Sequence, residues 1–234
     1  MNKRLPHGPA FRVLFEDRHL LVADKPAGMA TMGAAPGQPS LVEAVREHLR
    51  RCHGSGVDPF VGVVSRLDAS VTGAVVLART SGVAAALSTQ FAERSIDKTY
   101  LAIVVPGPQV PAAECEDWLL HDDRQQRVRV VAAGTTGAKP ARLGYRVLRA
   151  LQRGALLEVR LDTGRKHQIR VQLASRGHAI AGDAKYGSAF GFPRGIALHA
   201  RSLCFTHPVE NRRMSLDAPV PGCWASWGVP DSKA

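Results

Sequence analysis

The sequence has few cysteines and no long apolar run, and each shortage excludes a class of protein. Its four cysteines are scattered without a C-x-x-C pair, so we expect neither a zinc site nor a disulfide framework. No run of about 18 apolar residues occurs, so no transmembrane helix is expected. The N-terminal residues lack the apolar segment of a secretory signal. We therefore expect a reduced, cytoplasmic protein without a membrane partner.

Acidic residues are also scarce relative to basic ones. The chain has 31 Lys and Arg against 20 Asp and Glu, which gives a formal net charge of +11. Such a balance favours a polyanionic partner, with nucleic acid first. Only 7 of the 31 basic residues are lysine, however, and a GC-rich coding sequence produces the same arginine bias. Charge alone leaves both explanations open.

The length and the hydrophobic pattern bound the fold class. A chain of 234 residues suits one large domain or two small ones. Period-two and apolar runs predict two short strands around a polar turn within 11–28, closed by Pro26 and Gly28. They predict further strands at 60–64, 74–78, 98–105, 118–121, 127–131, 141–151, 155–163 and 196–205. A helix is predicted at 40–51, because Ser40 and Glu43 form a capping-box pattern and the apolar residues Leu41, Val45 and Leu49 are spaced by four. Further helices are predicted at 80–91, with Thr80 as the cap, at 165–177, and as a short one at 221–228. Strands outnumber helices and most connections are short, which predicts an α+β domain with a largely antiparallel or mixed sheet.

A lone acid, Asp68, lies between two apolar runs in the stretch VVSRLDASVTGAVVLART. A buried carboxylate is costly unless it is paired. Aspartate is common in turns, and Ser70 and Gly73 also fit a turn. Arg66 would lie on the same side of the chain as Asp68 if the strand continued, as a partner for the acid or for a phosphate. A structural turn and a functional carboxylate both fit this pattern.

A second polar segment is DTGRKHQIR, residues 162–170. The pattern predicts the end of a strand, a Thr-Gly turn and a helix that opens with Arg165, Lys166 and His167. Cations at a helix N-terminus oppose the helix dipole. The segment therefore indicates an anionic partner, either a carboxylate or RNA phosphates, although a solvated basic helix start is the simpler alternative.

Other features carry less information by themselves. Tyr100 in KTYLAIVV is typical of a packing residue in a strand, and His199 fits a buried histidine of the core. No metal-ligand constellation, phosphate loop or dinucleotide fingerprint is present. The G-x-S-x-G pattern of serine hydrolases is also absent.

Five blocks taken together resemble a known family. LLVADKPAGMAT, SRLDASVTGAVVLART, KTYLAIVV, LDTGRKHQIRVQLASRGHAIAGDAKYG and LHARSLCFTHP occur in the order and spacing of the RluA-type RNA pseudouridine synthases, from about Phe11 to about Pro219. The resemblance implies the α+β pseudouridine synthase catalytic fold, a mixed, mostly antiparallel sheet flanked by a few helices and loops with a central RNA-binding cleft. It implies one catalytic domain over 11–227, with tails at 1–10 and 228–234. The N-terminal S4 RNA-binding module of many relatives is expected to be missing.

The resemblance also implies roles for single residues. Asp68 matches the catalytic aspartate of the R-L-D signature, and Tyr100 matches the tyrosine that stacks on the target base. Arg165 matches an arginine that pairs with the catalytic carboxylate. Arg66 matches an arginine that can replace a flipped base. The residues expected to contact RNA are Arg66, Lys98, Lys166, His167 and Arg170.

The match departs from the family pattern next to the aspartate. Family members usually read H-R-L-D-x-x-T-S-G, whereas this chain has Ser65 in place of the histidine and Val71-Thr72 in place of the T-S pair. We expect these changes to affect RNA contacts and substrate identity more than the chemistry.

The expected function is the site-specific isomerisation of uridine to pseudouridine in structured rRNA or tRNA. Neither cofactor nor metal is expected, because nothing is oxidised and no group leaves the RNA. RNA is the only expected partner, and the chain is expected to act as a monomer. The alternative is a catalytically weak RNA-binding or RNA-folding protein on the same scaffold, which the joint presence of Asp68, Tyr100 and Arg165 argues against. A basic DNA-binding module is disfavoured because no helix-turn-helix or finger pattern occurs.

Overall fold

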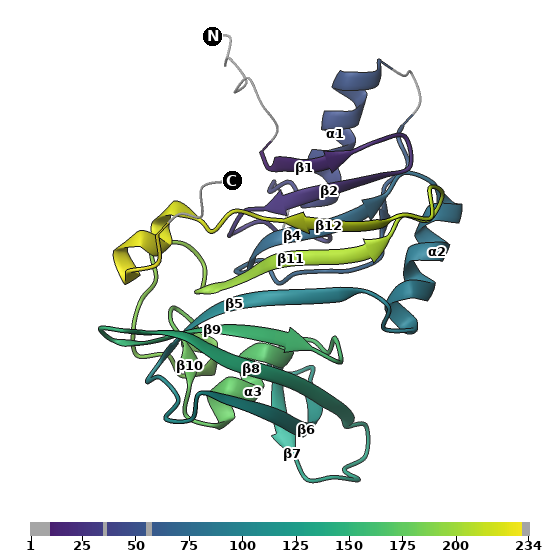
Figure 1. Ribbon diagram of the computed structural model, residues 1–234. Helices are drawn as coiled ribbons and strands as arrows, with labels where there is room; N and C mark the ends of the chain where they lie inside the picture. The colour runs from purple at the N-terminus through teal and green to yellow at the C-terminus, as the bar shows by residue number, and fades with distance from the viewer. Residues whose placement is uncertain (1–9, 35–36, 55–57, 231–234) are drawn as a thin grey trace.

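The computed structural model describes residues 10–34, 37–54 and 58–230, and one mixed sheet dominates them (Figure 1). Its strands are β1 (Arg12–Glu16), β2 (Leu20–Lys25), β3 (Gly62–Val63), β4 (Thr72–Ala78), β5 (Asp97–Val105), β6 (Ala112–Asp122), β7 (Arg127–Val131), β8 (Lys139–Leu151), β9 (Gly154–Leu161), β10 (Ala179–Ile180), β11 (Leu198–Thr206) and β12 (Arg213–Asp217). The main path runs β1-β2-β4-β11-β5-β9-β8-β6-β7. The β4–β11 pair is parallel, and the other pairs in the described residues are antiparallel. This confirms the predicted α+β class with a mixed, mostly antiparallel sheet.

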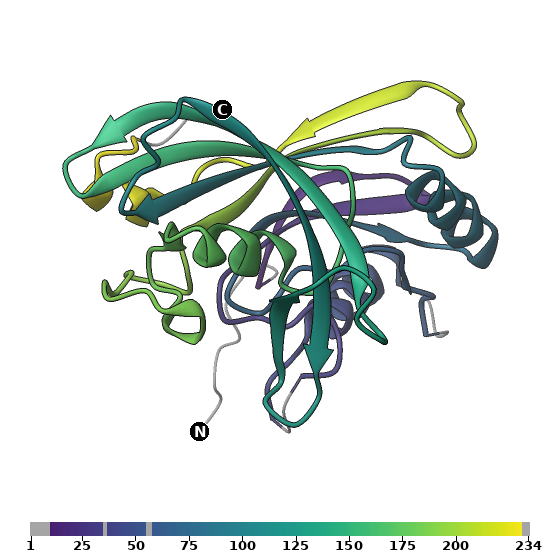
Figure 2. The same ribbon diagram turned by 90° about the horizontal axis from the view of Figure 1, so that it is seen from below.

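Helices cover the sheet at three places. They are α1 (Leu41–His53), α2 (Ser81–Ala92) and α3 (Gln168–Ser175), with 3-10 turns η1 (Ala184–Tyr186) and η2 (Gly222–Trp227). Figure 2 shows α3 lying beneath the curved sheet, where it packs on β6, β7 and β10. None of the helices in the described ranges is long and apolar enough to span a membrane.

The first two helices follow from their sequence signals. The predicted capping box is present, because the Ser40 side chain accepts from the Glu43 backbone N–H and the Glu43 side chain accepts from the Ser40 backbone N–H. The apolar side chains spaced by four, Leu41, Val45 and Leu49, are buried as predicted. Thr80 caps α2 as expected, with its hydroxyl accepting from Val83.

The parallel contact between β4 and β11 requires a glycine. Gly73 has φ +113°, and a Cβ atom there would lie 2.3 Å from the carbonyl oxygen of Ala200. No other residue permits so close a backbone approach. Next to it, the buried His199 accepts a hydrogen bond from the Thr72 hydroxyl (2.8 Å) and donates to the Ala218 carbonyl (3.2 Å). His199 is thus the satisfied core histidine that its sequence context suggested, and burial lowers its pKa to about 4.

Two local predictions were wrong. The helix predicted to open at Arg165 begins at Gln168, after His167 in a left-handed conformation with φ +53°. The three basic residues therefore precede the helix, and the argument from the helix dipole fails. The strand predicted at 60–64 is reduced to the short β3, and the chain from 64 to 68 has no regular structure. The reasoning that Arg66 shares a strand face with Asp68 therefore does not hold.

Three short elements were not predicted at all: β10, η1 and β12. Of the expected tails, 1–10 lies outside the described residues apart from Ala10. The residues of the other tail up to 230 are described, and Val229 is buried against the core.

Candidate active site

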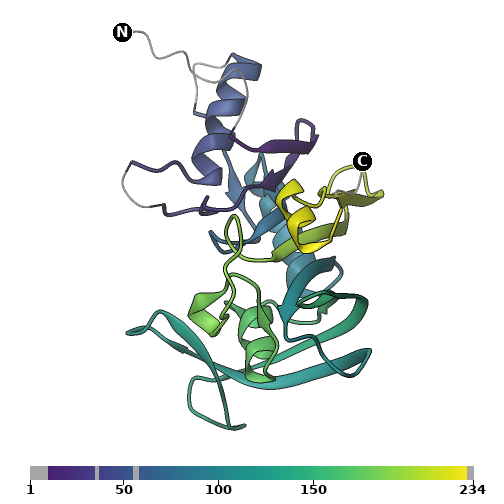
Figure 3. The same cartoon turned by 90° about the vertical axis from the view of Figure 1, so that its left-hand side faces the viewer.

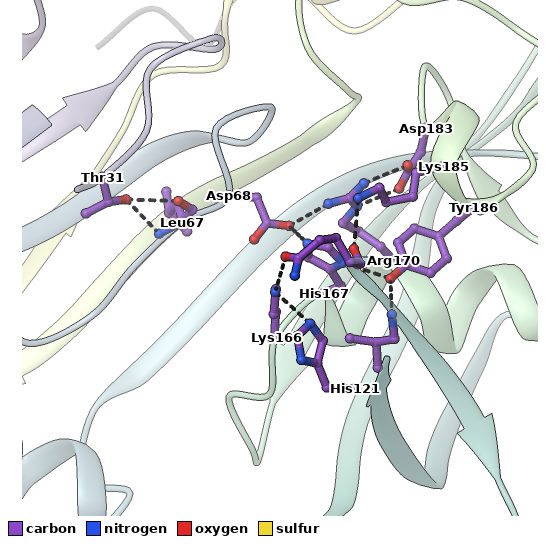
Figure 4. A network of polar contacts seen from close by, with 12 residues as sticks. Thr31, Leu67, Asp68, His121, Lys166, His167, Arg170, Asp183, Lys185 and Tyr186 are labelled. Carbon is purple, nitrogen blue, oxygen red and sulfur yellow. Dashed lines mark hydrogen bonds and ion pairs between the residues drawn. The ribbon is translucent and has the colours of Figure 1, made fainter. Parts of the chain in front are cut away.

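Asp68 lies in the loop between β3 and β4, and its two neighbours are fixed to the segment that follows β2 (Figure 4). The Thr31 hydroxyl donates to the Leu67 carbonyl (2.9 Å) and accepts from the Leu67 backbone N–H (3.1 Å). On the other side, the carbonyl of Ala69 accepts from the backbone N–H of Gly28 (2.8 Å). The backbone on both sides of the acid is therefore held before any substrate arrives.

Lys25 at the end of β2 supports the same loop from inside the protein. Its side chain is fully buried, and its Nζ donates to the carbonyls of Pro26 (2.9 Å), Met29 (2.7 Å) and Ala69 (3.3 Å). Burial lowers the pKa of Lys25 to about 8, while the negative charge of Asp68 opposes that shift. The sequence analysis did not single out Lys25, although a lysine that closes an apolar run before Pro-x-Gly needs partners.

Arg170 in the first turn of α3 is the counter-charge of Asp68. Its Nη1 donates to Asp68 Oδ2 (2.7 Å), and its Nε and Nη2 donate to the two carboxylate oxygens of Asp183 (2.7 and 2.8 Å). Burial alone would lower the pKa of Arg170, but both carboxylates raise it above its ordinary value. The side chain of Asp183 is 1% exposed and that of Asp68 is 28% exposed, so one guanidinium joins a buried acid to an accessible one.

This contact corrects the prediction for Arg165. Its Nε donates to the Pro140 carbonyl (3.1 Å), so it does not pair with Asp68. The reason is the late start of α3, which leaves Arg165 in the preceding turn and directs Arg170 inward. Arg170 was predicted to contact RNA, yet it is buried between Ile169 and Val171. A cation inside such a buried run must have a partner, and that signal was available in the sequence.

His167 belongs to the surroundings of the carboxylate rather than to a basic surface. Its Nε2 lies 3.6 Å from Asp68 Oδ2, and its Nδ1 lies 2.8 Å from the Tyr186 hydroxyl, which also accepts from the Val128 backbone N–H. Burial lowers the pKa of His167 to about 4, so the imidazole is neutral near neutral pH. The expected cation is therefore a neutral ring held between Tyr186 and Asp68.

Tyr100 on β5 is buried, and burial raises its pKa. The charge of Asp68 raises that pKa further, which places the two groups within electrostatic reach of each other. Lys98 lies two residues earlier on the same face of β5, and its Nζ sits 5.1 Å from the centre of the Phe91 ring. The carboxylate of Asp68 therefore acts electrostatically on the phenol of Tyr100, and Lys98 lies further along the strand.

The other two residues expected to contact RNA are exposed. Lys166 Nζ lies 2.7 Å from His121 Nε2, below Asp68 in Figure 4. Arg66 has no recorded hydrogen bond or ion pair to any other residue in the described ranges. Both side chains are exposed, and their roles as phosphate contacts stay predictions.

One group of side chains has the composition of a metal site within the described residues. It comprises Asp17, His207 and Glu210. His207 Nε2 donates to Asp17 (2.9 Å), and its Nδ1 accepts from the backbone N–H of Glu210 (3.0 Å). Both ring nitrogens are occupied, so this group joins two loops and does not fit a metal.

Comparison with known proteins decides the family. Residues 19–175 match the sequence model described as RNA pseudouridylate synthase. The chain belongs to this family. It is 35% identical over 228 residues to the ribosomal large subunit pseudouridine synthase D of Zymomonas mobilis, covering 92% of this chain and 71% of that relative. The enzyme of the same name from Xanthomonas campestris is 37% identical over 231 residues, covering 92% and 68%.

Solved structures agree with the family assignment. The structure of human RNA pseudouridylate synthase domain containing 4 superposes with a TM-score of 0.77 at 25% identity, covering 93% of this chain and 94% of that one. The protein is therefore an RNA pseudouridine synthase, which isomerises uridine to pseudouridine in RNA. The family match includes Asp68 and Arg170 and ends before Asp183 and Tyr186.

Proposed function

We propose that Asp68 is the catalytic carboxylate and that the substrate is the RNA of the large ribosomal subunit. One observation supports the assignment of Asp68 as the catalytic carboxylate. Arg170 and His167 both contact Oδ2 of Asp68, and within the described residues no partner is recorded for Oδ1. One oxygen is thus fixed by the protein, and the other is available to the substrate on a side chain that remains 28% exposed.

The isomerisation breaks the C1′–N1 bond of uridine, turns the uracil and joins C5 to C1′. The proton lost from C5 balances the proton gained at N1, so the reaction needs no oxidant and no second substrate. The sugar is reached only when the nucleotide leaves the stack, so base flipping is part of the proposal. Asp68 acts in its ionised form, as nucleophile or base, and the guanidinium of Arg170 stabilises that form.

Two further residues have proposed roles around the flipped nucleotide. Tyr100 stacks on the uracil, and its raised pKa keeps it a phenol, so it can donate a hydrogen bond but is a poor base in its resting state. Arg66 is exposed near Asp68, and we assign it the space that the flipped base leaves. We propose that a monomer is the active unit, because Asp68 finds its counter-charge, Arg170, within the same chain.

The assignment of the substrate is based on the names of the relatives and on the net charge of this chain. The two curated relatives are named for the large ribosomal subunit, and a net charge of +11 suits a folded RNA with dense phosphates. The test is to map pseudouridine in rRNA and tRNA from a strain that lacks the gene and from the same strain complemented with it. The expected result is loss of pseudouridine from large-subunit rRNA and its return on complementation. Loss from tRNA alone would contradict the proposed substrate, and no change in either RNA would favour the weak RNA-binding alternative.

A further inference from the structure

Aromatic side chains gather at one part of the surface. Only 13 residues of the chain are Phe, Trp or Tyr, and four of them form one cluster: Phe190, Phe192, Trp224 and Trp227. The ring of Trp227 lies 6.5 Å from that of Phe190 and 5.9 Å from that of Phe192. Trp224 is buried, whereas Phe190 is 38% exposed. The cluster therefore reaches from the core to solvent.

A groove lined in part by two arginines adjoins this cluster. One hollow of about 840 Å³ lies between Trp227, Phe192 and two arginines near the β8–β9 turn, Arg149 and Arg153. A second hollow of about 570 Å³ shares Arg153 with the first and is lined by Phe190. We call the two hollows together the aromatic groove.

The charge of the aromatic groove has one sign. No aspartate or glutamate lines either hollow among the described residues. A hollow at the other end of β8 and β9 differs, since it is lined by Glu114, Glu116, Glu158 and Asp162 as well as arginines. Aromatic rings with unopposed guanidinium groups suit a ligand that offers both flat bases and phosphates.

The loop at 187–195 connects the aromatic groove to the active site. At one end Gly182, next to Asp183, donates its backbone N–H to the Phe190 carbonyl (2.9 Å). At the other end Ile196 donates to the carbonyl of Ser70 (3.1 Å), two residues after Asp68. Figure 3 shows this loop near the centre of the molecule, beside η2. The loop that carries Phe190 is therefore tied by backbone hydrogen bonds to the segments that hold Asp183 and Asp68.

We infer that the aromatic groove binds a single-stranded segment of the substrate RNA that flanks the flipped uridine, with bases stacked on Phe190 and Trp227 and a phosphate on Arg153. The inference rests on the proposed RNA substrate but not on the role of Asp68. A segment held here lengthens the contact with RNA without needing another domain. A purely apolar partner would cover the rings but would leave Arg149 and Arg153 without counter-charges.

The test is fluorescence anisotropy with a fluorescein-labelled 12-nucleotide single-stranded RNA over a salt series. Phe190→Ala is the stacking variant, and Phe60→Ala is its control, since Phe60 is 48% exposed and lies outside the groove. Arg153→Ala is the phosphate variant, and Arg51→Ala on α1 is its control, with a side chain 47% exposed. Phe190→Ala should weaken binding at least about fivefold. Arg153→Ala should reduce the slope of log K against log salt by about 0.7.

Both controls should bind within about twofold of the unchanged protein. If Phe190→Ala matched Phe60→Ala, and Arg153→Ala matched Arg51→Ala, the inference would be overturned. It would also be overturned if light scattering showed that Phe190→Ala dissociates a dimer, because the groove would then be an interface between copies. The assay reads binding and not isomerisation, so a failure of the proposed role of Asp68 would leave its outcome unaffected.

Discussion

Replacing Arg170 by methionine should separate what this residue does for the fold from what it does for the chemistry. The change removes the guanidinium from Asp183, whose side chain is 1% exposed. A buried carboxylate left without its partner costs about 3–5 kcal/mol of unfolding free energy. For a chain of this size that corresponds to a fall of roughly 6–20 °C in melting temperature. Turnover should fall as well, because Asp68 loses the group that fixes Oδ2 and stabilises its charge.

A second substitution distinguishes the two effects. Arg170→Met combined with Asp183→Leu replaces the buried pair by apolar side chains, which is often neutral for stability. The double variant should therefore regain most of the lost stability in urea unfolding, while its single-turnover rate stays low. Arg165→Met is the matched control, since Arg165 contacts the Pro140 carbonyl. It should stay within about 1 kcal/mol in stability and retain most of its single-turnover rate at saturating enzyme.

Two outcomes would refute this reasoning. Arg170→Met with nearly unchanged unfolding free energy would show that the Asp183 carboxylate does not depend on the guanidinium. Recovery of turnover in the double variant would show that the counter-charge on Asp68 is not needed.

Three further predictions concern the surroundings of Asp68 and the buried histidines. Tyr100→Phe should preserve RNA binding in a filter assay, because the aromatic ring remains. The variant should have a lower single-turnover rate if the hydroxyl takes part in the reaction, whereas full activity would limit Tyr100 to stacking. Lys25→Met should lower the unfolding free energy by about 1–3 kcal/mol, measured in urea, because buried carbonyls lose their donor; a neutral effect would contradict its role. His167 and His199 have pKa values near 4 in the folded protein, below the ordinary 6.5, so the unfolded chain binds more protons between those values. Stability should therefore fall as pH drops from 6.5 to 4, by up to about 1.4 kcal/mol per pH unit for each histidine, and His199→Gln should flatten the profile.

The sequence was sufficient for the parts of the molecule that short-range patterns determine. The capping box at Ser40, the cap at Thr80 and the apolar strands β4 and β5 were predicted because each depends on neighbouring residues. The resemblance to the family placed Asp68 and Tyr100, and the structure brings them within electrostatic reach of each other.

The partner of the acid could not be obtained in the same way. Choosing between Arg165 and Arg170 depends on where α3 begins, and the left-handed His167 delays that start. Asp183 follows at a distance of 13 residues from Arg170, in a segment without helix or strand periodicity, so only the folded chain reveals their contact. Tyr186 in η1 escaped prediction for the same reason.

The most direct test of the central claim is to compare pseudouridine formation by the unchanged protein and by Asp68→Asn on rRNA from the strain that lacks the gene. The substitution keeps the shape of the side chain and removes its charge, so RNA binding should be retained. The unchanged protein should form pseudouridine at a defined position, and Asp68→Asn should form none under the same conditions. Turnover of Asp68→Asn within about tenfold of the unchanged protein, a difference worth only about 1.4 kcal/mol in activation free energy, would contradict the account of Asp68 as the catalytic carboxylate.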